Sequence, residues 1–69
     1  MHAMITVTKL NDFEIVINSE LIEMIESTPD TTITMTTGRK VIVKDTVDCV
    51  LDKIYAFKVK IKEGHASNM

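Results

Sequence analysis

Apolar and polar residues alternate along the first part of the chain, and this two-residue period is typical of half-buried β-strands. From Met4 to Leu10, Ile5 and Val7 lie on one side and threonines on the other. A second run has apolar residues on one face at Phe13, Ile15 and Ile17. Asn11 and Asp12 stand between the runs, and both tolerate the left-handed backbone geometry of a tight turn. The pattern predicts a β-hairpin.

A second hairpin is predicted after a polar break. The run from Leu21 to Ser27 fits either strand alternation or one helical turn, and we assign it as a strand. The reason is that Pro29 and Asp30 would then join it to the alternating run from Thr31 to Thr36. Proline presets φ for a type I turn, and aspartate can bond to neighbouring backbone amides.

A short fifth strand is predicted from Arg39 to Lys44, after a turn at Gly38. The strands leave some apolar residues on the faces opposite the main core positions: Val16, Met24 and Ile42. A sheet with one helix cannot easily cover both of its faces. We therefore expect a barrel-like curl or a partner chain to cover them.

The period changes near the end of the chain, where apolar residues recur at the spacing of an amphipathic helix. The helix is predicted from Thr46 to about Lys62, with its apolar face formed by Val47, Val50, Leu51, Ile54, Phe57 and Ile61. We expect Asp45 to cap the free amides, Asp48 to favour the amino end in a capping box, and Gly64 to end the helix.

The predicted fold class is α+β: a small antiparallel sheet of about five strands, two hairpins plus a short strand, followed by one C-terminal amphipathic helix. Residues 4–62 form the single predicted domain, and residues 1–3 and 63–69 are expected to be flexible tails. A chain of 69 residues buries only about 60% of its unfolded surface, so one copy alone is marginally stable. We expect a homo-oligomer, with exposed strand edges as one route to association.

Charge and composition narrow the function classes. Eight Lys and Arg against ten Asp and Glu give a formal net charge of −2, which offers no bulk attraction to nucleic acid or acidic lipid. The single cysteine, Cys49, rules out an internal disulfide and fits a reducing cytoplasm. No secretion signal and no apolar run of about eighteen residues is present. We expect a cytoplasmic protein without a membrane span.

The sequence predicts no catalytic, cofactor or metal site. His2, His65 and Cys49 lack the spacing of zinc ligands, and Cys49 has no nearby base. The glutamates are too scattered for a paired-acid site. Basic residues around the fifth strand leave one alternative function open, a small RNA-binding post-transcriptional regulator, although the aromatic residues of a stacking platform are missing.

Three pieces of sequence are more specific than the periodicity: residues 7–11, 29–31 and 38–40, the last leading into Val43 and Lys44. With them, the chain from Met4 to Ile61 resembles the flagellar FlbD family, also called SwrD in swarming bacteria. Asp12 departs from the family pattern, which often has glycine there. Thr37 stands where asparagine is common before glycine.

The resemblance implies a small, cytoplasmic, non-enzymatic protein of bacterial flagellar motility, with a role connected to motor function or swarming. We expect it to contact a component of the flagellar motor or basal body near the membrane-embedded flagellar base. Turns on rigid strands can project recognition groups. The candidate interaction residues are therefore Pro29, Asp30, Arg39, Lys40 and Lys44.

Overall fold

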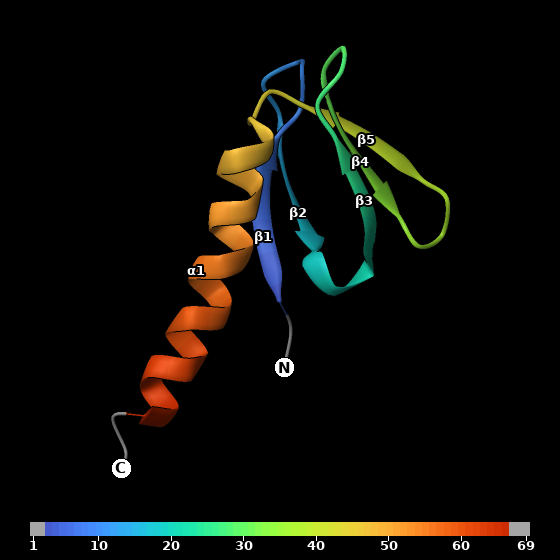
Figure 1. The fold of residues 1–69 in the computed structure, drawn as a ribbon. Coiled ribbons are helices and arrows are strands. Elements are labelled where there is room, and N and C mark those ends of the chain that lie inside the picture. The colour runs from blue at the N-terminus through green and yellow to red at the C-terminus, as the bar shows by residue number, and fades with distance from the viewer. Residues whose placement is uncertain (1–2, 67–69) are drawn as a thin grey trace.

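The computed structural model describes the backbone of residues 3–66 and the side chains of residues 3–56. These residues form five strands, a single 3₁₀ turn and one helix (Figure 1). The elements are β1 (Met4–Thr8), β2 (Glu14–Asn18), η1 (Ser19–Leu21), β3 (Ile22–Glu26), β4 (Thr31–Met35), β5 (Lys40–Val43) and α1 (Val47–Ala66). The predicted α+β class, with two hairpins, a short strand and a C-terminal helix, is confirmed.

The strands form two antiparallel ladders where the sequence suggests one sheet. One ladder pairs β1 with β2, and the other has the strand order β3-β4-β5. The two ladders meet where an isolated bridge pairs Lys9 with Val43 and the Lys44 amide donates to the Thr8 carbonyl over 2.7 Å. The backbone groups of β1 and β5 thus bond only at this end.

The core lies between the two ladders and the first turns of α1. Its buried residues are Ile5, Val7, Ile33, Met35, Val43 and Val50. The strand register explains why these residues are buried. Val7 pairs with Ile15 and Ile33 pairs with Val41, so each ladder turns one apolar face inward. The residues predicted on the opposite faces, Val16, Met24 and Ile42, are exposed.

The two tight hairpin loops have the same hydrogen-bond pattern. In the β1–β2 loop the Asp12 amide donates to the Lys9 carbonyl, and in the β4–β5 loop the Gly38 amide donates to the Met35 carbonyl. Asp12 and Gly38 are the residues with positive φ, at 72° and 93°. This is the three-residue hairpin loop in which a type I turn is followed by a left-handed residue. Both predicted turns are confirmed, with the left-handed residue now identified.

Two details of these hairpins differ from the sequence-based interpretation. Phe13 precedes β2 and is 69% exposed, because its carbonyl closes the loop by accepting from the Lys9 amide. It does not share the inner face of Ile15 and Ile17. The link between β3 and β4 is a bend at residues 28–30 with a cis Thr28–Pro29 peptide bond, and not the predicted type I turn.

The ends of α1 also differ from the prediction. The cap is Thr46, whose Oγ1 accepts the Cys49 amide over 3.1 Å, because Asp45 turns back to bind elsewhere. Asp48 lies in the first turn, as expected, but the capping box is not formed. The helix continues through Gly64 to Ala66, so Gly64 does not end it.

Residues assigned to the tails and to the helix face need two further corrections. Ala3 is buried, and its carbonyl accepts from both the amide and the hydroxyl of Ser19. Leu51, predicted on the apolar face of α1, is 40% exposed, whereas Val50 is fully buried and Ile54 packs against the core. Phe57 and Ile61 lie outside the residues whose side chains are described.

Candidate interaction surfaces

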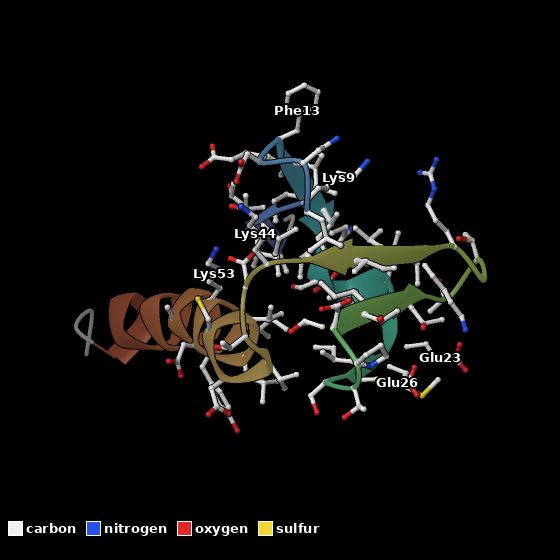
Figure 2. The ribbon with its side chains drawn as sticks, turned by 90° about the horizontal axis from the view of Figure 1, so that it is seen from above. Lys9, Phe13, Glu23, Glu26, Lys44 and Lys53 are labelled. Atoms are coloured by element: carbon white, nitrogen blue, oxygen red, sulfur yellow. The ribbon has the colours of Figure 1, made fainter. Side chains whose placement is uncertain are left out.

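The tip of the β1–β2 hairpin presents two large apolar side chains. Phe13 is 69% exposed and Leu10 is 50% exposed. Figure 2 shows Phe13 projecting away from the rest of the molecule. The loop behind them is well held, because the Phe13 amide donates to Asn11 Oδ1 over 3.1 Å in addition to the backbone bonds. An exposed aromatic residue on a fixed loop is typical of the contact points that anchor protein interfaces.

Two cations lie beside this tip, from elements that are far apart in the sequence. Lys9 precedes the loop, and Lys44 follows β5 and forms an ion pair with Asp12 (Figure 2). Both partners of the ion pair are largely exposed, so its contribution to stability is small. The pair instead holds Lys44 against the loop. We call Lys9, Leu10, Phe13 and Lys44 the hairpin-tip surface.

A groove of about 810 Å³ lies between β2 and β5. It is lined by Lys9, Leu10, Asn11, Ile15, Val16, Ile17, Asn18, Met35, Arg39, Lys40, Val41 and Ile42. Aliphatic side chains from both strands supply its apolar part. Its charged lining residues, among those the structure describes, are three cations and no acid. The groove therefore combines aliphatic side chains with cations.

The opposite edge of the three-stranded ladder is acidic. Glu23 and Glu26 belong to β3, Glu20 precedes it, and all three are exposed. Figure 2 shows Glu23 and Glu26 on the far side of the molecule from Lys9, with β5 between them. The separation begins in the sequence, since residues 10–38 contain six acidic residues and no Lys or Arg. Strand order then converts this segregation along the chain into two surfaces of opposite sign.

Asp45 has a structural role at the junction of the two ladders and α1. Its Oδ1 accepts the Thr8 amide over 2.7 Å, and its Oδ2 accepts from Lys53 Nζ over 2.9 Å. Lys53 also donates to the Thr6 carbonyl. Burial of the Asp45 side chain opposes ionisation, but the hydrogen bonds from Thr8 and Lys53 outweigh it, and the pKa of Asp45 lies below its ordinary value. The carboxylate ties α1 to β1.

The structure divides the candidate residues predicted from the sequence between the two ends of the three-stranded ladder. Pairing of Thr31 with Val43 puts Pro29, Asp30 and Lys44 at one end of the ladder, where Lys44 contacts the β1–β2 loop through Asp12. Arg39 and Lys40 lie at the opposite end, where they line the groove. The five candidate residues therefore do not form one surface.

Sequence reasoning missed Phe13 and Leu10 as surface residues. Alternation alone puts Phe13 in phase with Ile15 and Ile17. The signal that could have separated Phe13 from the strand is the Asn11-Asp12 pair. A left-handed residue at position 12 moves the next residue out of the strand.

The described residues also bear on metal binding and membrane insertion. They contain no group of three or more His, Cys, Asp or Glu side chains placed to hold a metal ion. They also contain no helix with a stretch long and apolar enough to cross a membrane.

Comparison with known protein families gives a match. Residues 4–62 match the family model FlbD, whose description is flagellar and swarming motility proteins. This range includes the five strands, the hairpin-tip surface and most of α1. No curated protein and no solved structure matches the chain.

Proposed function

We propose, from the premise that this chain belongs to the FlbD family of flagellar and swarming motility proteins, that it serves motility by binding another protein at the flagellar base. It acts in the cytoplasm, without catalysis, on a component of the motor or basal body. The effect is on motor function or torque, and hence on swarming. The part of this proposal that concerns motility rests on the family, and the part that concerns binding rests on the hairpin-tip surface.

The observation that carries the binding proposal is the exposure of Phe13. A 69% exposed phenylalanine contributes little to the stability of a single copy of this chain. Aromatic side chains are enriched in the energetic centres of protein interfaces, with polar and charged residues around them. Lys9 and Lys44 give the hairpin-tip surface such surroundings, and they favour a partner with acidic residues beside an apolar pocket.

The test compares two aromatic residues of nearly equal exposure on different elements. Phe13 is 69% exposed on the hairpin tip, and Tyr55 is 67% exposed on α1. A strain that lacks the chain is complemented with wild type, Phe13→Ala or Tyr55→Ala, and swarm expansion is measured at matched protein levels. We expect Phe13→Ala to fall close to the deletion strain and Tyr55→Ala to stay near wild type. Denaturation of the purified variants checks that each change costs less than about 0.5 kcal/mol.

The same three proteins are then used to recover partners from motile cells, with and without RNase. Recovery of motor or basal-body proteins by wild type and Tyr55→Ala, but not by Phe13→Ala, supports the proposal. The recovery of these proteins must also survive RNase treatment. Loss of every specific partner after RNase, with enrichment of defined transcripts, would favour the RNA-binding alternative. Full swarming by Phe13→Ala would show that the hairpin-tip surface is not the contact.

A further inference from the structure

We infer that this chain associates with further copies of itself, head to tail, by placing the acidic β3 edge of one copy against the groove and basic β5 edge of the next. The inference concerns self-association and does not depend on the role in motility. It uses two surfaces on one molecule. The groove shares Lys9 and Leu10 with the hairpin-tip surface, and the β3 edge shares none of its residues.

Both surfaces are strand edges that the rest of the fold leaves open. In the ladder β3-β4-β5, the outer strands each pair with β4 on one side. Beyond that, β5 makes only the bridge from Val43 to Lys9 at its end, and no bridge joins β3 to the other ladder among the described strands. Open edges of this kind take up a further strand through backbone hydrogen bonds. The groove beside β5 provides space for one.

The charges on the two edges are complementary. Arg39 directly precedes β5 and Lys40 is its first residue. Glu23 and Glu26 belong to β3. Two copies joined β5 to β5 or β3 to β3 would bring like charges to one interface, which is unfavourable when the contact is close. Joining β5 to β3 brings opposite charges together. The charges therefore favour a heterologous contact over a two-fold symmetric one.

Apolar side chains accompany the charges on both edges. Met24 on β3 and Ile42 on β5 are 46% and 44% exposed, and Leu21 beside β3 is 46% exposed. The exposed residues of β3 are the acidic Glu23 and Glu26 and the apolar Met24, and this combination suits a groove whose lining is aliphatic and basic. A second copy is thus an occupant whose complementary surface is itself described. Burial of these residues would also add to the small core of one chain.

A head-to-tail contact leaves one free β3 edge and one free β5 edge on every open assembly. Such contacts close into a ring if the rotation between copies allows it, and otherwise continue as an open row. The mass of the assembly then depends on protein concentration for an open row, or stops at one value for a ring. Salt weakens either form, because the edge charges are exposed.

The test measures mass by light scattering and sedimentation across dilution and salt. One variant carries Arg39→Glu and Lys40→Glu, and a second carries Glu23→Lys and Glu26→Lys. We expect each to lower the association constant at least about tenfold, because like charges then face each other. Circular dichroism checks that both variants remain folded.

A fourfold variant with both sets of changes is the control, since its net charge equals that of the wild type. It has an acidic β5 edge and a basic β3 edge, so self-association should return. An equimolar mixture of the two double variants should also associate. A wild type that stays monomeric at every concentration overturns the inference, and so does association that is unchanged in the double variants. Failure of the fourfold variant to recover, while folded, would also overturn it.

Discussion

Asp12 and Gly38 occupy equivalent places in two loops of the same geometry. Each has positive φ, and the residue before it supplies a side-chain acceptor to the amide two positions on: Asn11 for Phe13 and Thr37 for Arg39. An asparagine followed by glycine would satisfy both requirements. The first loop has the asparagine acceptor with Asp12 in place of glycine, and the second has the glycine with the Thr37 hydroxyl as acceptor in place of an asparagine side chain. The two departures from the family pattern are therefore compatible with one loop design.

Thr34 has a buried hydroxyl whose Oγ1 has no hydrogen-bond partner among the described residues. We expect Thr34→Val to stabilise the fold by about 1 kcal/mol, because valine removes the unsatisfied oxygen and suits a strand. Urea denaturation measures the change. Thr32→Val is the matched control on the same strand face, where Oγ1 donates to the Asp30 carbonyl over 3.2 Å. Equal gains in both variants would contradict the role given to the unpaired hydroxyl.

Asp45 gives the fold a dependence on pH at acid values. Its pKa is lower in the folded chain than the unfolded value of about 3.9, so its stabilisation is present above about pH 4 and is lost as pH falls through the folded pKa. We expect Asp45→Asn to cost about 2 kcal/mol at pH 7, since an amide places a donor against Lys53. The cost should shrink towards pH 3.

Urea denaturation at pH 7 and pH 3 measures both effects. Asp52→Asn is the control, because Asp52 is exposed on α1 and forms none of the described ion pairs. A cost for Asp45→Asn that is the same at both pH values would show that the loss comes from packing and not from ionisation.

At the scale of the elements, β3 shows why its sequence fits two patterns. Ile22 and Ile25 are three residues apart, a helical spacing, yet both pack against the core. A bulge between Ile22 and Met24 makes this possible, since it shifts the phase of the strand by one residue. The apolar spacing could not distinguish a bulged strand from a helical turn. The neighbouring strand β4 resolves it by pairing with both halves.

The docking of α1 depends on the buried side chain of Val50 and on the hydrogen bond from Lys53 to Asp45. Val50 is fully buried in the core, while Leu51 next to it is 40% exposed. We expect Val50→Ala to cost about 2 kcal/mol and Leu51→Ala less than half of that, even though alanine favours helix in both. Denaturation followed by circular dichroism measures the difference. Equal costs would mean that Leu51 is buried by something beyond the described residues, such as a second copy.

At the scale of the whole molecule, the sequence predicts the elements better than their arrangement. Alternation and the change of period predict the strands and the helix, because each local pattern needs only its own segment. The division into two ladders depends on where β1 meets β5, and a single bridge at Lys9 decides it. Local patterns contain no information about that contact.

The candidate surfaces, too, are predictable where they depend on one strand and not where they depend on contacts between strands. The exposed outer residues Val16, Met24 and Ile42 were predictable from the strand faces alone. The gathering of Lys44 with the β1–β2 loop, and the separation of Arg39 and Lys40 from Pro29 and Asp30, depend on strand order. The proposed self-association would link stability to concentration, so the variants above are compared at one protein concentration.

The absence of cations between Lys9 and Arg39 has a practical consequence for a protease that cuts after Lys and Arg. Every bond that such an enzyme could cut follows Lys9, just after β1, or lies at the entry to β5 or beyond it. The segment from Leu10 to Arg39, with β2, β3 and β4, would leave the digest as one uncut peptide of 30 residues. Peptide mapping with trypsin therefore follows nearly half of this protein as a single mass.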